Sequence, residues 1–234
     1  KKRLDYPKKP PIGGGASLTA ANGRLYSFGG CRCPDGGADE VTPATTTRDN
    51  NLPLRCFDAD SFHEIDIPNN DDDTTFPTND RTAAAARALR DRFNHTCVQH
   101  GNDLYVFGGQ SITRDSQRQQ RTWNDIHRFD TTRRQWSDIS PETTTAAVVV
   151  APRGERKQPS ARHSHAAVSM TDGKMIIFGG ADERGAALND VWTFCYRSRT
   201  WREITTFGEK EAAVPEGREM HCAVVLEREM YVMG

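Results

Sequence analysis

Short apolar runs, each ending at glycine, recur along this chain. Three of them end at a glycine pair and a fourth stops at a single glycine: Gly29-Gly30, Gly108-Gly109, Gly179-Gly180 and Gly234. A run of three to five apolar residues bounded by turn residues is typical of a buried β-strand. The glycine pairs suit positions where a neighbouring backbone comes close or where φ is positive. The recurrence predicts an internal repeat.

Other signals accompany each glycine pair. An Arg-x-x-His motif opens a small apolar run upstream of three copies, at Arg92–His95, Arg162–His165 and Arg218–His221. Downstream, an Asn-Asp pair precedes a phenylalanine, and a tryptophan follows seven positions later, as Phe129 with Trp136 and Phe194 with Trp201. The first copy keeps Phe57 but has Glu64 at the tryptophan position, with Gly13 and Ala16 where arginine and histidine stand elsewhere.

These landmarks predict four short antiparallel strands in each repeat. The first strand follows the histidine, and the second ends at the glycine pair. The third carries the phenylalanine, and the fourth carries the tryptophan. A four-stranded sheet with two apolar faces cannot bury both faces alone, so copies must stack on one another. Radial stacking gives an all-β fold, a β-propeller of four-stranded antiparallel blades.

The glycine pair, the aromatic residue and the tryptophan resemble the kelch repeat, in the order that this family shows. Phenylalanine stands where the family usually has tyrosine. The resemblance covers most of residues 13–234 and implies a kelch-type β-propeller. We assign a degenerate repeat 1 to 13–67, repeat 2 to 92–140, repeat 3 to 159–206 and the first half of repeat 4 to 215–234. The remaining segments are a basic N-terminal arm (1–12) and two low-complexity insert loops (68–91 and 141–158).

About three and a half blades therefore occupy the chain, fewer than the four to eight of a typical propeller. We expect an incomplete propeller that belongs to a longer kelch chain. The alanine-rich stretch 83–90 is long enough for one or two helical turns, which are marginal in isolation.

The recurrence of certain residues favours structural roles over catalytic ones. A residue needed once for chemistry has no reason to recur in every blade, whereas the same loop backbone must be satisfied in each. On this ground the structural set is Gly29, Gly30, Gly108, Gly109, Gly179, Gly180, Phe57, Phe129, Trp136, Phe194, Trp201, His95, His165 and His221. The histidines have an alternative role in lining a ligand-binding rim, and the tryptophans have one as exposed anchors.

No motif indicates a metal or a cofactor. His163 and His165 share one face of a strand, but no third ligand is evident beside them. Cys31-x-Cys33 lacks a partner pair at zinc-site spacing. We therefore expect no cofactor, no metal and no catalytic residue.

Charged loops between strands are the candidate recognition surface, because loops on a rigid scaffold commonly carry function. We predict a partner-binding rim formed by Arg92, Arg162, His163 and Arg218, suited to an acidic peptide or a phosphopeptide.

Composition narrows the classes of function. The 234 residues carry a net charge of −1, 35% are hydrophobic, and the mean hydropathy is −0.73. This balance argues against a dedicated nucleic-acid binder, and the apolar runs are too short for a membrane helix. Six cysteines do not form a dense disulfide framework, so we expect a cytoplasmic protein, with cytoskeletal association as an option.

The kelch resemblance implies a non-enzymatic scaffold that binds another protein, or another segment of a longer chain, through its rim loops. We expect no nucleic acid, membrane or small-molecule partner. Three alternatives stay open: the propeller domain of a larger enzyme, a ubiquitin-ligase adaptor, or a kelch-type enzyme such as a sugar-acid epimerase or a copper oxidase.

Overall fold

The computed structural model describes residues 15–32, 42–43, 54–61, 64–65, 89, 92–112, 120–141, 158–205 and 215–234. The N-terminal arm, most of both insert loops, Cys33 and all of the alanine-rich stretch except Leu89 lie outside these residues. No helix in the described part of the chain is long and apolar enough to cross a membrane.

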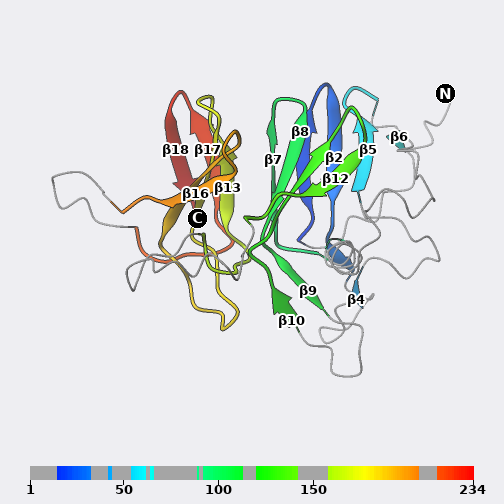
Figure 1. Cartoon of the computed structure of the whole chain (residues 1–234). Helices are drawn as coiled ribbons and strands as arrows, with labels where there is room; N and C mark the ends of the chain where they lie inside the picture. The colour runs from blue at the N-terminus through cyan, green and yellow to red at the C-terminus, as the bar shows by residue number, and fades with distance from the viewer. Residues whose placement is uncertain are drawn as a thin grey trace, which may run out of the picture.

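Three four-stranded antiparallel sheets follow one another along the chain (Figure 1). The first blade contains β1 (Ser17–Ala21), β2 (Arg24–Phe28), β5 (Leu54–Asp58) and β6 (Glu64–Ile65). The second contains β7 (Thr96–His100), β8 (Asp103–Phe107), β11 (Ile126–Asp130) and β12 (Gln135–Asp138). The third contains β13 (Ala166–Ser169), β14 (Lys174–Phe178), β15 (Val191–Cys195) and β16 (Thr200–Glu203).

A two-stranded hairpin follows the third blade, formed by β17 (Cys222–Leu226) and β18 (Glu229–Met233). Two small ribbons complete the described strands: β3 (Cys31–Arg32) with β4 (Thr42–Pro43), and β9 (Gln110–Ile112) with β10 (Gln120–Thr122). This arrangement confirms the all-β fold of three blades and part of a fourth.

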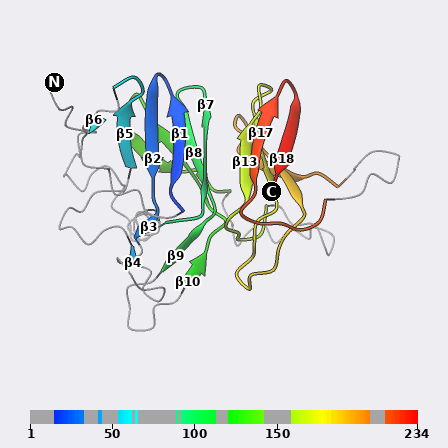
Figure 2. The ribbon, with the colours of Figure 1, turned by 180° about the vertical axis from the view of Figure 1, so that it is seen from behind.

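The first strands of successive blades lie next to one another. β1 contacts β7, β7 contacts β13, and β13 contacts β17, so these strands form the inner edge of the stack. Figure 2 shows β17 and β13 side by side, with β18 beyond β17. The tryptophan strands β12 and β16 are the outermost strands of their sheets.

Each interface between two complete blades is an apolar core with an aromatic centre. Trp136 lies 5.1 Å from Phe28 of the preceding blade and 5.0 Å from Phe129 of its own sheet, between ring centroids. Trp201 repeats this arrangement, 4.8 Å from Phe107 and 4.9 Å from Phe194.

Strand register explains why the first repeat looks degenerate. Phe129 pairs with Trp136 and Phe194 pairs with Trp201 across neighbouring strands, and Phe57 pairs with Glu64 in the same way. The backbone of the first blade therefore keeps the register of the repeat, although its side chain at the tryptophan position has changed.

Local sequence accounts for the tight turns. Asn22 and Gly23 join β1 to β2 with φ of 52° and 69°. Two consecutive residues with positive φ suit the right-handed twist of a β-hairpin, and asparagine and glycine tolerate them best. The turns of this kind lie at one end of the blades, which we call the hairpin end. The glycine pairs and the Arg-x-x-His motifs lie at the opposite end, the rim end.

Candidate interaction surface

The rim end is built around one contact that recurs between successive blades. We call it the latch: the arginine and histidine of one blade set against the glycine pair of the blade before. The second glycine donates its N–H to the carbonyl of the next blade's arginine, from Gly30 to Arg92 at 2.8 Å and from Gly109 to Arg162 at 2.8 Å. Gly180 makes the same bond to Arg218, at 2.9 Å.

The first glycine of each pair leaves room for the next blade. A Cβ built on Gly108 would lie 2.7 Å from the Arg162 carbonyl oxygen and 3.0 Å from the His165 ring. With a φ of +62°, Gly108 is also in a conformation that side chains disfavour. Close approach and positive φ, the two reasons that favoured glycine in the sequence, therefore both apply here.

The histidines of the latch pack edge-on against the phenylalanine at the end of the preceding blade's second strand. His95 lies 4.9 Å from Phe28, and His165 lies 5.3 Å from Phe107, between ring centroids. His95 Nε2 hydrogen-bonds to Ser17 Oγ at 2.8 Å. His165 Nε2 makes the equivalent bond to Thr96 Oγ1, also at 2.8 Å.

Burial keeps these histidines neutral at physiological pH. Desolvation, reinforced by the charge of Arg92, lowers the pKa of His95 to about 3. Burial and then Arg162 hold the pKa of His165 well below its ordinary value. The Nδ1 atoms of both rings are buried without a hydrogen-bond partner, so neither ring offers an exposed nitrogen to a ligand.

The arginines of the first two latches bind a carboxylate of their own blade. Arg92 donates from Nη1 and Nη2 to the two oxygens of Asp125, at 2.5 and 2.8 Å, and from Nη1 to the Gly108 carbonyl. Arg162 forms the same fork with Asp190, at 2.7 and 2.7 Å, and donates to the Gly179 carbonyl. Burial would raise the pKa of Asp125, but the Arg92 guanidinium outweighs it and holds that pKa well below its ordinary value.

These contacts correct the predicted rim for two of its residues. The side chains of Arg92 and Arg162 are fully buried, so they hold the blade together and present nothing to a partner. Arg218 is half-buried and donates to the carbonyls of Glu216 and Gly234. His163 is half-buried, with Nδ1 3.0 Å from Ser164 Oγ and 4.0 Å from Glu219 Oε2.

Sequence reasoning missed a row of four residues, one directly before the histidine position of each repeat, which we call the inner rim: Gly15, Asn94, Ser164 and Met220. All four have positive φ, and each later member donates its N–H to the carbonyl of the member before it, at 2.8 to 2.9 Å. Gly15 and Asn94 gave a signal for this in the sequence, because glycine and asparagine are the residues that best tolerate positive φ.

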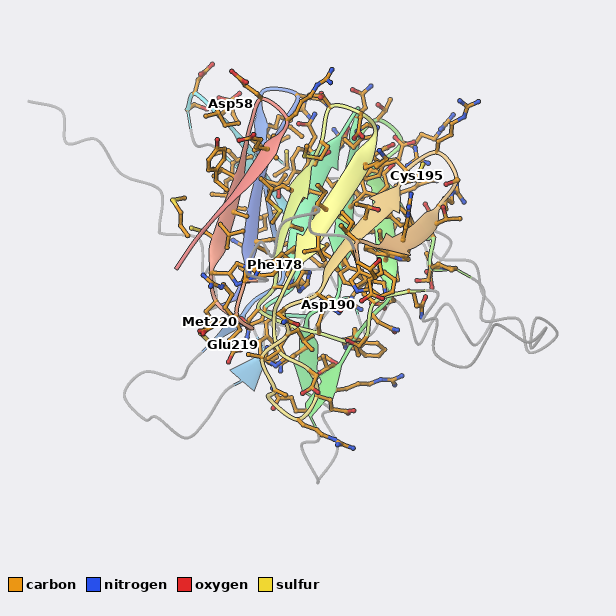
Figure 3. The ribbon with its side chains drawn as sticks, turned by 90° about the vertical axis from the view of Figure 1, so that its left-hand side faces the viewer. Asp58, Phe178, Asp190, Cys195, Glu219 and Met220 are labelled. Carbon is orange, nitrogen blue, oxygen red and sulfur yellow. The ribbon has the colours of Figure 1, made fainter. Side chains whose placement is uncertain are left out.

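The two end members of the inner rim, Gly15 and Met220, are exposed. Asn94 and Ser164 are half-buried, whereas Met220 is 79% exposed and holds a φ of +58°. Figure 3 shows Met220 beside Glu219 at one end of the blades, with Asp58 and Cys195 at the other. The positive φ belongs to the repeat, because all four members of the inner rim have it; Met220 differs from the others in presenting a long, exposed apolar side chain.

The β9–β10 ribbon extends the rim end beyond the sheets, as Figure 1 shows. Trp123, directly after β10, donates from Nε1 to Ser111 Oγ at 2.9 Å. The guanidinium carbon of Arg121 lies 4.0 Å from the centre of the Trp123 ring, and Arg121 itself is exposed. The ribbon thus presents a stacked cation on the same end as the inner rim.

Among the described residues, no group of three histidine, cysteine, aspartate or glutamate side chains is placed to hold a metal ion. The described cysteines Cys56, Cys97, Cys195 and Cys222 are free thiols.

Curated relatives of this chain are proteins of different sizes. It is 28% identical over 144 residues to Kelch domain-containing protein 3 of Bos taurus, which covers 61% of this chain and 34% of that protein. It is 30% identical over 143 residues to the dynein alpha chain of the flagellar outer arm of Chlamydomonas reinhardtii, covering 61% of this chain and 3% of that protein. The chain thus spans about a third, or far less, of these relatives.

A third relative is the Leucine-zipper-like transcriptional regulator 1 homolog of Drosophila melanogaster, 34% identical over 118 residues, or 50% of this chain and 10% of that protein. A family model, the KLHDC2/KLHL20/DRC7 Kelch-repeats domain, matches residues 94–234. This match takes in the second and third blades and the last hairpin, where the latches repeat. The blades, the latches and the family-model match all indicate the same repeat. The chain belongs to the kelch-repeat family.

Proposed function

We propose that this chain is a non-enzymatic protein-interaction module whose partner docks on the rim end. Kelch-repeat domains generally serve protein–protein interaction, which supports the class of function. The partner would contact Met220 of the inner rim, its neighbours Glu219 and His163, and Arg121 on the β9–β10 ribbon.

The observation that carries this proposal is the exposed apolar side chain of Met220 on the rim end. Methionine is enriched at protein interfaces, where its flexible side chain adapts to a partner. Glu219 and Arg121 add charges of both signs around it, as expected for the polar border of an interface.

The experiment compares proteins captured from a cell extract by the unaltered chain and by a rim variant. Met220→Asp with Arg121→Glu changes the exposed surface, and aspartate tolerates positive φ. We expect the captured partner to fall at least tenfold while the melting temperature stays within a few degrees. Arg197→Glu, on an exposed turn at the hairpin end, is the matched control and should capture as the unaltered chain does.

Equal capture by the rim variant and the unaltered chain would contradict docking on the rim end. Copper retained through purification, or turnover of a sugar acid, would contradict the non-enzymatic class and favour the oxidase or epimerase alternative.

The match to a small part of the dynein alpha chain of the flagellar outer arm supports a related proposal, that the module is one domain of a longer protein. A ubiquitin-ligase adaptor is one such arrangement, and ligase subunits among the captured proteins would favour it. The free thiols fit the reducing cytoplasm that we propose as its location.

A further inference from the structure

The turn between β1 and β2 carries the only asparagine in the sequence that is followed directly by glycine, Asn22-Gly23. Both residues are exposed, and they lie at the hairpin end, away from the surface proposed for partner docking. An asparagine side chain can bring its amide carbon, Cγ, to the main-chain nitrogen of the next residue. Attack of that nitrogen on Cγ closes a five-membered succinimide ring, so the surroundings of the nitrogen decide how readily the asparagine changes.

The nitrogen of Gly23 is open to this reaction. Its N–H donates to no residue in the described part of the chain, because the strand pairing closes one step outside the turn, between Ala21 and Arg24. Glycine also lacks the side chain that would shield the nitrogen. A Cβ built on Gly23 would have no heavy atom within 4 Å beyond its chain neighbours. Solvent and base therefore reach this nitrogen, and the ring has room to form.

Two other turns at the hairpin end lack this combination. Asn102, in the β7–β8 turn, is also exposed, but the next nitrogen belongs to Asp103, which carries a side chain and pairs with His100 in the strand register. In the β13–β14 turn, the Gly173 nitrogen donates to the Met170 carbonyl at 3.3 Å, and an aspartate precedes this glycine. Among the described turns of the hairpin end, the β1–β2 turn alone places an asparagine amide before an unbonded glycine nitrogen.

The amide group of Asn22 also joins the first blade to the second. Its Nδ2 donates to Thr131 Oγ1 at 3.2 Å, and Thr131 Oγ1 in turn donates to the Asn102 carbonyl at 2.5 Å. The hydroxyl hydrogen of Thr131 is thus already used, and its oxygen accepts from the first blade. An ionised carboxylate has no hydrogen to donate, so a carboxylate at position 22 would break this bond.

We propose that Asn22 is a site of spontaneous deamidation, and that this modification loosens the first blade from the second at the hairpin end. Base removes the proton from the Gly23 nitrogen, which then forms a bond to Asn22 Cγ. The bond from Cγ to Nδ2 breaks, and the amide nitrogen leaves as ammonia. Water then opens the succinimide ring. The net change consumes one water, releases one ammonia and leaves a carboxylate, with no oxidant or reductant.

The two ways of opening the ring change the turn differently. Hydrolysis at Cγ gives aspartate, which keeps the backbone of the turn but loses the donor to Thr131. Hydrolysis at the main-chain carbonyl gives isoaspartate, in which the main chain runs through the side-chain carbons. The lengthened main chain does not fit a two-residue turn, because φ values of 52° at Asn22 and 69° at Gly23 set the pairing of the strands that follow.

The first test follows the full chain during incubation at neutral and mildly alkaline pH, with peptide mapping by mass spectrometry. The peptide that contains Asn22 should gain the mass difference between an amide and a carboxyl group at least ten times faster than the peptide that contains Asn102. The gain should be faster at the higher pH. Conversion of Asn22 no faster than that of Asn102 would overturn the proposal.

Two variants locate the reaction. Asn22→Gln keeps an amide group but would have to close a larger, less favourable ring, so it should remove the mass gain from this peptide. Asn102→Gln is the matched control in the next blade and should leave the conversion of Asn22 unchanged. A mass gain in the same peptide of Asn22→Gln would place the reaction elsewhere and contradict the assignment to Asn22.

Hydrogen exchange tests the consequence for the fold. Amides of β1 and β2 should exchange at least tenfold faster in the incubated chain than in the fresh one, whereas Asn22→Gln should show no such change on incubation. Asn22→Asp lacks the donor to Thr131 but keeps the backbone, so its exchange should lie between these two. Complete conversion of Asn22 with unchanged exchange of both strands would contradict the loosening of the first blade.

Discussion

Two latches invite comparison: one joins the second and third blades, and the other joins the third blade and the last hairpin. Their backbone contacts are the same, but their side-chain contacts differ. Both have the glycine pair, the bond from the second glycine to the arginine carbonyl and the histidine edge-on to phenylalanine. The histidine of the former has a hydroxyl partner, Thr96 for His165, and its arginine forms a forked ion pair with Asp190, which lies just before the third strand of the blade, a position that the two-stranded hairpin does not include.

The later latch replaces that hydroxyl with Ala166, and both ring nitrogens of His221 are buried without a partner. The comparison separates two kinds of contact between successive blades. Glycine and backbone contacts set where successive blades meet, and the polar side chains add stability to that arrangement. Four predictions test this separation, from the largest effect to the smallest.

Replacing the buried arginine should have the largest effect. Arg162→Met leaves the Asp190 carboxylate without its partner, and breaking a buried ion pair in this way costs about 3–5 kcal/mol. Arg218→Met is the matched change in the later latch, where the arginine is half-buried and bonds only to carbonyls among the described residues. It should cost about 1 kcal/mol. Chemical denaturation of the two variants measures the free energy of unfolding that each one loses. Equal losses would contradict the distinction between the two latches.

Adding a methyl group at the first glycine should affect both latches equally. A Cβ would meet the arginine carbonyl at 2.7 Å and the histidine ring at 3.0 Å at Gly108 and at Gly179 alike. We expect each alanine variant to lose about 3 kcal/mol from strain and overpacking. Gly101→Ala has a similar φ of +59° but open space around it, so it should lose only about 1 kcal/mol. A loss at Gly101 as large as at Gly108 would show that φ alone, and not the close approach, matters.

Acid should weaken the latch through its buried histidines. The unfolded chain protonates histidine near pH 6.5, whereas the pKa of His95 in the fold is about 3. Between these values the unfolded state binds the extra proton, so the free energy of unfolding falls as pH falls, by up to about 1.4 kcal/mol per pH unit for each such histidine. Melting temperatures between pH 7.5 and 4.5 should show this decline, and His95→Gln should make it shallower. If His95→Gln leaves the decline of melting temperature with falling pH unchanged, His95 does not cause that decline.

Supplying the missing hydroxyl should give a small gain. Ala166→Ser places an oxygen at the position from which Ser17 and Thr96 reach the histidine of the next blade. We expect a bond to His221 Nε2 and a stabilisation of about 1 kcal/mol. Thr96→Ala, which makes the reverse change in the earlier latch, should lose a similar amount. A destabilised Ala166→Ser would show that the histidine environments of the two latches are not equivalent.

Much of the fold could be predicted from short-range patterns. Apolar runs, turn residues and the fixed Phe–Trp spacing act within a few residues, so they identified the four strands of each blade and the tryptophan strand. The positive φ of the glycine pairs was foreseeable for the same reason. The inner rim was not predicted. Two of its four positions hold serine and methionine, which do not indicate a positive φ as glycine and asparagine do.

The roles of the arginines could not be read from their spacing. An Arg-x-x-His motif before a strand has the same sequence whether its arginine faces solvent or a carboxylate on the third strand. Asp125 and Asp190 are far along the chain from Arg92 and Arg162, and only the folding of each sheet brings them together.

The sequence by itself determined that this is a chain of kelch-type blades, because strand patterns and turn chemistry are local and repeat four times. Tertiary structure decided which side chains are buried and which are exposed. It turned Arg92 and Arg162 from surface candidates into buried ion pairs and left Met220 exposed. The physical reason is that burial depends on what the neighbouring blade places against a residue, and no local pattern carries that information.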